Sequence, residues 1–281
     1  TGKMSVRVVF MGSPDFAASS LRYLLDNSVI VVGVVTRPDR PKGRGRKLSP
    51  TSVKEAALSR GIPVITPERL DDEDFIGSLR ALEAHLFVVV AFRIIPPAVF
   101  SLPPLGTINL HASLLPRYRG AAPINHAIIN GDRITGLTTF LINEGLDTGG
   151  ILLQREIPIG ENETAGELME RMIQPGAELL LETVRGLERG ELTPVPQAEN
   201  GASSAPKLRK SDGRIHWDRP ARSIHNLVRG TNPWPGAFCF SSGKHLKIHR
   251  TRIVNESTEG PPGRVVEASG KGGVRLSLIH I

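Results

Sequence analysis

Three polar side chains near the middle of the sequence have types and spacings suited to catalysis. Asn109 and His111 stand two residues apart in an apolar segment, and Asp147 stands in the turn Gly-Leu-Asp-Thr-Gly at 145–149. Successive side chains of a β-strand point to opposite faces, so a strand here places Asn109 and His111 on one face. Turn residues follow them, which puts both side chains near the carboxyl end of the strand, where open α/β sheets bind ligands.

An amide, an imidazole and a carboxylate in one site suit the transfer of an acyl group to an amine. The Asn109 amide can donate a hydrogen bond to the oxyanion of a tetrahedral intermediate. His111 can relay a proton, and Asp147 can raise the basicity of the imidazole or accept the proton itself. A second interpretation stays open on spacing alone, in which His111 is a buried structural residue and Asp147 only forms a turn.

The apolar pattern predicts the elements that hold these residues. The first 110 or so residues alternate strand and helix signals, which is typical of a mostly parallel sheet with crossover helices. We predict strands at 6–11, 29–35, 62–65 and 86–92, and helices at 14–25, 54–60 and 72–84. After the strand of Asn109, we expect a helix at 123–130, strands at 137–142 and 150–159, and a helix at 164–190 that is broken or kinked near Pro175.

Several cofactors and partners are not expected. Pro14 stands where a dinucleotide fingerprint needs its second glycine after Gly12, so we expect no NAD. His245 and His249 share a strand face without an evident third ligand, so we expect no metal. The longest apolar runs are far shorter than the roughly 20 residues of a membrane span. The single cysteine, Cys239, indicates a small core residue in a cytoplasmic protein, since it excludes an internal disulfide.

Positive charge is concentrated in two places. The net charge is +7, and residues 204–281 hold 14 Lys and Arg against five Asp and Glu, so the preceding residues sum to −2. Those preceding residues nevertheless include the loop 37–47, with six basic residues and one acidic. Such concentration is typical of a protein that binds a polyanion. A solvated basic surface without a partner is the alternative.

The residues around Asn109 and Asp147 also resemble a family signature. The motifs Asn-x-His-x-Ser-Leu-Leu-Pro and Gly-x-Asp-x-Gly recur in the 10-formyltetrahydrofolate-dependent formyltransferases, and both stand here, at 109–116 and 145–149. The resemblance implies that 10-formyltetrahydrofolate is the formyl donor and that the catalytic set is Asn109, His111 and Asp147. It further implies that the folate site is lined by Ser113, Leu114, Leu115 and Pro116.

Within that family, the sequence is most similar to the members that act on initiator tRNA. The similarity runs along nearly the whole chain, including the segments 9–17, 37–47, 119–123 and 232–236. It implies transfer of the formyl group to the α-amino group of methionyl initiator tRNA, for translation initiation. The implied tRNA contacts lie in the basic loop, which a formyltransferase for small amines has no reason to carry: Arg37, Arg40, Lys42, Arg44, Arg46 and Lys47.

Two other functions stay open. A formyltransferase acting on a sugar nucleotide or on glycinamide ribonucleotide would use the same catalytic set. A nucleic-acid-binding module on an inactive scaffold would be favoured if the three side chains did not converge. One departure from the family pattern bears on the folate site, because Phe92, Arg93 and Ile94 stand where a Tyr-Gly pair is expected. This segment resembles the glycinamide ribonucleotide formyltransferases instead, and we include it among the candidate folate-binding residues.

The predicted fold class is α/β, with a Rossmann-like, mostly parallel sheet covered by helices on both faces. Short strands at 236–240, 246–253, 263–268 and 273–281, after a helix at 221–229, indicate a small C-terminal β-barrel of the oligonucleotide-binding type. The sequence thus divides into a catalytic domain at 4–190, a linker at 191–206 and a basic tRNA-binding domain at 207–281. The last five residues differ from the family's usual ending, which leaves a truncated barrel as an alternative. We expect a monomer.

Overall fold

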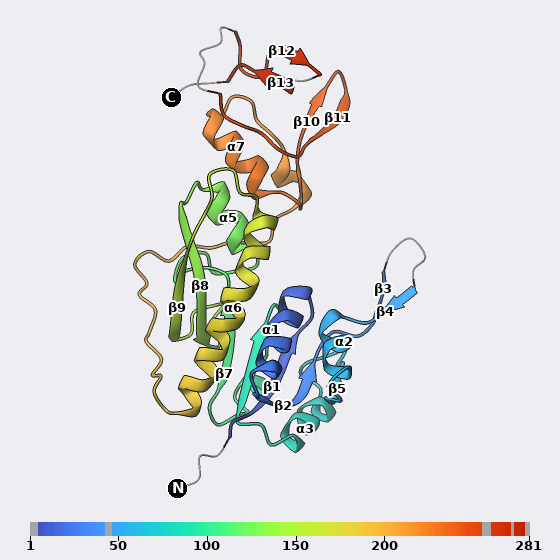
Figure 1. Cartoon of the computed structure of the whole chain (residues 1–281), viewed down its shortest axis with the longest axis vertical. Coiled ribbons are helices and arrows are strands. Elements are labelled where there is room, and N and C mark those ends of the chain that lie inside the picture. The colour runs from blue at the N-terminus through green and yellow to red at the C-terminus, as the bar shows by residue number, and fades with distance from the viewer. Residues whose placement is uncertain (1–4, 43–46, 255–259, 271–272, 279–281) are drawn as a thin grey trace. The chain divides into compact units, whose positions relative to one another are not determined.

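The computed structural model describes residues 5–42, 47–254, 260–270 and 273–278 (Figure 1). The chain forms two compact units. The first consists of Thr1–Arg119, Gly136–Ile157 and Glu170–Ser203, and the second of Gly120–Thr135, Pro158–Met169 and Ser204–Ile281.

A seven-stranded sheet is the framework of the candidate site. Its strands are β1 (Arg7–Gly12), β2 (Ile30–Val35), β5 (Val64–Ile65), β6 (Leu86–Val90), β7 (Thr107–His111), β8 (Ile134–Leu141) and β9 (Ile151–Pro158), in the order β5-β2-β1-β6-β7-β8-β9. The strands from β5 to β7 are parallel, and β8 runs antiparallel to β7. The mostly parallel sheet predicted from the sequence is therefore confirmed.

The order of the strands creates a ligand-binding edge. From β1 the chain builds β2 and β5 on one side, and it then crosses to add β6 and β7 on the other side. The direction of winding reverses between β1 and β6, and α/β sheets bind ligands outside the carboxyl ends of strands at such a reversal. Strand β7 ends at this edge with His111, one strand away from the reversal.

Helices cover both faces of the sheet. They are α1 (Asp15–Asp26), α2 (Ser52–Leu58), α3 (Glu73–Ala81), α4 (Pro97–Phe100) and α6 (Ala165–Glu188). On one face, Met11 and Phe87 share a buried cluster with Phe75 of α3 and Val99 of α4. On the other face, Gly176 of α6 lies against Leu110 of β7 and Phe16 of α1. The prediction of helices on both faces is confirmed.

Of the break or kink expected near Pro175, the break does not occur: α6 continues through the proline as one helix (Figure 1). Proline removes one backbone donor from the helix. Burial outweighs this loss: Met172, Leu179 and Leu180 on the same helix are almost completely buried. Tertiary packing thus overrides the local signal.

The second unit contains α5 (Pro123–Ile129), a short 3₁₀ helix (Lys210–Gly213), α7 (Ala221–Gly230) and two hairpins. The hairpins are β10 (Ala237–Ser241) with β11 (Lys244–Ile248), and β12 (Val265–Ser269) with β13 (Gly273–Leu276). Ile224 and Val228 of α7 pack with Ala237 and Cys239 of β10. The thiol is a buried core group, as predicted, and burial raises the pKa of Cys239. Residues 279–281, where the last predicted strand ends, lie outside the described residues.

The basic loop contains a hairpin that the sequence pattern did not reveal. Arg40–Lys42 (β3) pairs antiparallel with Lys47–Ser49 (β4), and Pro41 lies opposite Leu48. Proline is accepted in such a two-stranded ribbon because each strand has a free edge. The predicted tRNA contacts Arg44 and Arg46 lie outside the described residues.

Candidate active site

Asn109 offers an amide at the carboxyl edge of the sheet. It lies on β7 between Val89 of β6 and Phe140 of β8, and its side chain is half-buried. Within the described part of the chain, the structure records no hydrogen bond for this side chain. The two amide N–H groups can therefore donate to a bound ligand without breaking a contact inside the protein.

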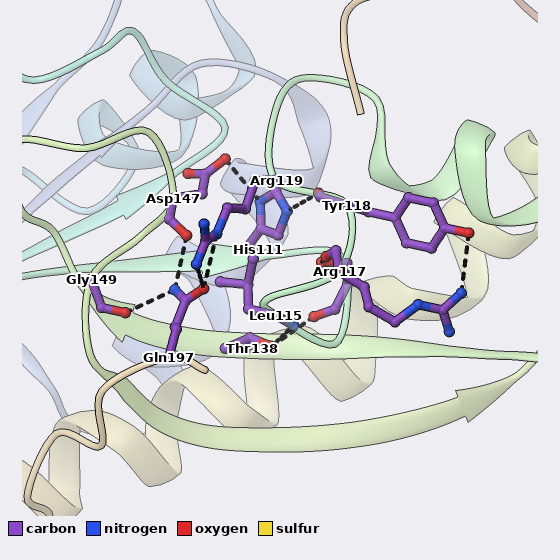
Figure 2. Close-up of polar contacts among 10 residues, drawn as sticks. His111, Leu115, Arg117, Tyr118, Arg119, Thr138, Asp147, Gly149 and Gln197 are labelled. Atoms are coloured by element: carbon purple, nitrogen blue, oxygen red, sulfur yellow. Dashed lines mark hydrogen bonds and ion pairs between the residues drawn. The ribbon is translucent and has the colours of Figure 1, made fainter. Parts of the chain in front are cut away.

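His111, on the same strand face, is buried and has a polar neighbour at each ring nitrogen (Figure 2). Its Nε2 lies 2.8 Å from the carbonyl oxygen of Tyr118, and its Nδ1 lies 3.8 Å from Oδ2 of Asp147. A carbonyl can only accept, so Nε2 carries the hydrogen. In the neutral ring, Nδ1 is consequently the unprotonated nitrogen, and it faces the carboxylate. The ring also packs edge-to-face on Phe140.

A tight loop presents the Asp147 carboxylate. Asp147 has a φ of 53°, a left-handed conformation that Asp tolerates better than most residues. The Asn143 side-chain oxygen accepts hydrogen bonds from the backbone of Gly145 and the hydroxyl of Thr148. A Cβ at Gly149 would lie 1.6 Å from the carbonyl oxygen of Leu141, so only glycine fits there. The loop returns the carboxylate to the edge where β7 ends, and the Asp147 side chain is 12% exposed.

The structure therefore brings His111 and Asp147 together and places Asn109 on the same face of β7. The interpretation of His111 and Asp147 as unrelated structural residues is not favoured, because the imidazole and the carboxylate face each other from segments on either side of β8. An amide donor beside a carboxylate–imidazole pair can stabilise an oxyanion and accept a proton.

The predicted folate residues at 113–116 form a turn that is hydrogen-bonded to Thr138 of β8 (Figure 2) and to Gln154 of β9. The buried Ser113 hydroxyl donates to the carbonyl of Arg117 at 2.6 Å, and the Thr138 hydroxyl donates to the carbonyl of Ser113. The amide of Leu115 donates to Thr138, and its carbonyl accepts from Gln154. Leu115 is buried, whereas Leu114 and Pro116 are half-buried. Most polar groups of the turn are thus used to fix its shape.

The segment at 92–94 follows β6 at the same edge. The Arg93 guanidinium donates to the carbonyl oxygens of Pro67 at 2.7 Å and Glu68 at 2.9 Å, and it lies over the Phe92 ring. Burial and the neighbouring Arg37 lower the pKa of Arg93. Ile94, in contrast, is 82% exposed. Arg93 shapes this segment through its backbone contacts, and Ile94 leaves an apolar surface open to a ligand.

Sequence reasoning missed Gln197. This half-buried residue lies in the segment expected to be a linker, and its amide contacts the backbone of Asp147 and Gly149 and the side chain of Arg119. Gln197 is 50 residues from Asp147 in sequence. A glutamine between prolines and small polar residues carries no pattern that could have indicated this contact.

The described ranges contain neither a cluster of metal ligands nor a membrane-spanning helix. No group of three or more His, Cys, Asp or Glu residues there is arranged to hold a metal ion. No helix there is long and apolar enough to cross a membrane.

Comparisons with known proteins agree with this geometry. Residues 5–184 match the family model described as formyl transferase, and residues 207–277 match the model for the formyl transferase C-terminal domain. The chain is 52% identical over 264 residues to a methionyl-tRNA formyltransferase of Pelobacter propionicus, covering 94% of this chain and 82% of that protein. It is 48% identical over 275 residues to the methionyl-tRNA formyltransferase of Trichlorobacter lovleyi, covering 98% and 86%.

Among solved structures, the chain is similar to the N-formyltransferase from Helicobacter canadensis, which was solved with folinic acid and dTDP-3-aminofucose. The TM-score is 0.70 at 22% identity, covering 97% of this chain and 99% of that one. At this identity the similarity supports the fold alone, and it extends over both parts of the chain.

Proposed function

The chain belongs to the formyl transferase family, within its methionyl-tRNA formyltransferases, and on that premise we propose how its residues perform the reaction. The enzyme transfers the formyl group of 10-formyltetrahydrofolate to the α-amino group of methionine carried by initiator tRNA. The observation that carries the proposal is the pairing of His111 with Asp147 at 3.8 Å, beside the Asn109 amide, at the ligand-binding edge of the sheet.

The amine is the nucleophile, and the protein supplies a donor for the oxyanion. An α-amine titrates near about 7.7–8.0, so an appreciable fraction is neutral at physiological pH. Its nitrogen attacks the formyl carbon, a C–N bond forms, and the carbonyl oxygen becomes an oxyanion to which Asn109 donates. The bond from that carbon to N10 of the folate then breaks, and N10 takes up a proton as tetrahydrofolate leaves.

The proton released by the attacking amine goes to the pair of Asp147 and His111. When the His111 ring is neutral, its unprotonated Nδ1 faces the carboxylate with no hydrogen between the two atoms. A proton bound to either Nδ1 of His111 or Oδ2 of Asp147 can be donated in a hydrogen bond to the other atom. The pair can therefore accept the amine proton and return one to N10, which balances the reaction.

We propose that the folate donor lies along the segments 92–94 and 113–116. Ile94 and Leu114 supply apolar surface there, because Ile94 is exposed and Leu114 is half-buried. Most polar groups of the 113–116 turn bond within the protein, so this turn contributes mainly shape.

For tRNA, we propose two contact regions: the 37–47 loop and the basic domain at 207–281, with 191–206 connecting that domain to the catalytic domain at 4–190. The β10–β11 hairpin supports the second region. Phe240 is 55% exposed, Arg214 lies over its ring, and His245 and Lys247 stand on the same face. Exposed aromatic rings among cations are typical of surfaces that bind nucleic acid.

We further propose that the enzyme acts as a monomer in the cytoplasm. All three candidate catalytic side chains come from one chain, so no second copy is needed to complete the site. The substrate tRNA is used where translation begins.

One assay tests the substrate. Purified protein receives 10-formyltetrahydrofolate labelled in the formyl group, with methionyl initiator tRNA, a sugar nucleotide amine or glycinamide ribonucleotide offered in parallel. We expect label on the methionyl-tRNA at a kcat/KM far above that of either small amine. Preferential labelling of a small amine would contradict the proposal, and no transfer to any acceptor would favour the inactive binding module.

Replacing Arg40 and Lys42 with Ala is expected to raise the KM for tRNA and to leave the affinity for folate unchanged. The loss of two charge contacts, at about 0.2–1 kcal/mol each, predicts an increase in KM of about 2- to 30-fold. The slope of log KM against log salt should also fall, by about 0.7–0.9 for each lost phosphate contact. The measurement is initial-rate kinetics at several salt concentrations.

The control replaces Arg60 and Arg69, two exposed cations outside the loop that pair with Asp26 and Asp71. An equal rise of KM in the control would mean that the effect is one of net charge. A fall in folate affinity after the loop substitutions would assign the loop to the donor site.

A further inference from the structure

Gln197 lies outside the proposed catalytic set, yet it contacts the backbone of Asp147 and the side chain of Arg119, which follows Tyr118 (Figure 2). We propose that Gln197 is a positioning residue that holds the Asp147 carboxylate against His111. This inference rests on the formyl transfer proposed above. It gives the segment at 191–206 a part in the reaction, in addition to connecting the two domains.

The Gln197 amide is fully used. Its Nε2 donates to the carbonyl oxygens of Asp147 and Gly149, each at 2.8 Å. Its Oε1 accepts from Nε of Arg119 at 3.1 Å and from Nη2 at 2.8 Å. A flipped amide would place oxygen against two carbonyls and hydrogen against a guanidinium. The four contacts therefore allow one orientation.

The Asp147 loop needs such a support at this place. The Asn143 side chain accepts hydrogen bonds from Gly145 and Thr148, whereas the Gln197 amide donates to the carbonyls of Asp147 and Gly149. Asp147 lies between Gly145 and Thr148 and has a φ of 53°, a conformation that surrounding contacts must hold. Gln197 fixes the peptide groups that follow Asp147 and Gly149, and the direction of the Asp147 side chain follows from the backbone that carries it.

The same segment also holds the His111 side of the pair. The carbonyl that accepts from His111 belongs to Tyr118, whose own amide donates to the Ser203 hydroxyl at 2.9 Å. The amide of Arg119 donates to the Ser203 carbonyl at 2.8 Å. Gln197 thus connects a chain of contacts that reaches Asp147 at one end and Tyr118 at the other. A small shift of this segment would alter the distance between His111 and Asp147.

Gln197 is itself held in place. Two residues earlier, Val195 exchanges two backbone hydrogen bonds of 2.8 Å with Ile151 at the start of β9. Glu199, two residues later, is 85% exposed and only approaches Arg119 at 3.8 Å. The residues around Gln197 therefore supply both an anchor and a matched control.

The test uses the full-length enzyme with Gln197→Glu and Gln197→Ala. Glu keeps the shape and the contact to Arg119 but places oxygen against the two carbonyls, and Ala removes all four contacts. Since a displacement of about 1 Å can cost about 10²-fold, we expect kcat to fall by about 10- to 100-fold in both variants. The KM values for tRNA and folate should change little. Glu199→Ala should keep the parent kcat.

A double-mutant cycle with Asp147→Asn separates positioning from a general structural role. If Gln197 acts through the Asp147 carboxylate, either Gln197 substitution should cost little further rate once that carboxylate is gone. Losses that multiply in the double variant would overturn the proposal, as would parent-like kcat in the single variants. Loss of folding, seen by circular dichroism, in both Gln197 variants would show that the contact serves stability and would also overturn it.

In the double-mutant cycle, the kcat of each variant is compared with that of the parent enzyme, using the acceptor on which the parent is most active. If the parent prefers a small amine over methionyl-tRNA, the proposed substrate fails, yet the cycle still reports whether Gln197 acts through Asp147. The two proposals can therefore fail separately.

Discussion

Replacing Asp147 with Asn is expected to lower the kcat of formyl transfer by about 10²- to 10⁴-fold, the usual effect of losing a general base. Asparagine has nearly the same size as aspartate and tolerates the left-handed backbone at this position. The loop contacts to Gln197 use the Asp147 carbonyl, which the substitution leaves intact. Charge and basicity are lost, whereas the shape of the loop is kept.

The measurement is single-turnover formylation of methionyl-tRNA, with folate binding followed by calorimetry. Folate affinity and melting temperature should match those of the parent. Asp71→Asn, at an exposed residue paired with Arg69, is the control and should retain full activity. A rate within about threefold of the parent would contradict the role of Asp147, since general-base loss is expected to cost far more.

Replacing Asn109 with Ala is expected to lower kcat by about 10²- to 10³-fold, as found when one donor to an oxyanion is removed. The structure records no partner for the Asn109 amide among the described residues, so truncation leaves no protein group there without its hydrogen bond. The melting temperature should accordingly change little. The KM values for both substrates should also stay unchanged, because the oxyanion exists only after the amine has attacked.

Asn109→Asp extends this test. It keeps the shape of the side chain, removes both N–H donors and brings a carboxylate toward the developing oxyanion, so kcat should fall at least as far as with Ala. Asn27→Ala, which removes a side-chain contact at the end of α1, serves as the control. An Asp variant faster than the Ala variant would mean that Asn109 contributes space or polarity, and not a hydrogen bond to the oxyanion.

Much of the fold could be predicted because its signals are local. The strand containing Asn109 and His111 was predicted from its apolar pattern, and β7 places both on one face. The α6 break was predicted wrongly from Pro175, since the burial of Met172, Leu179 and Leu180 depends on residues far away in sequence. The β3–β4 hairpin was missed because its sequence is basic and rich in Gly and Pro, without strand alternation.

For the candidate site, the sequence indicated which chemical groups are present but not which nitrogen of His111 carries the hydrogen. The resemblance of residues 109–116 and 145–149 to a family motif indicated Asn109, His111 and Asp147. It left the roles of His111 and Asp147 open. The hydrogen bond from Nε2 of His111 to Tyr118 decides that Nδ1 faces the carboxylate, and this contact depends on a left-handed turn at Tyr118 that no residue pattern specifies.

The sequence by itself determined the chemistry that the protein can carry, because residue types, strand alternation and charge are properties of short stretches of chain. Only the tertiary structure decided that Asp147 meets His111 at 3.8 Å and that Gln197 joins the Asp147 loop to Arg119. These contacts link residues from 36 positions apart to 78 positions apart. Folding brings such partners together when β7, β8 and β9 pack into one sheet. A residue pattern along the chain does not show which distant residues will meet in space.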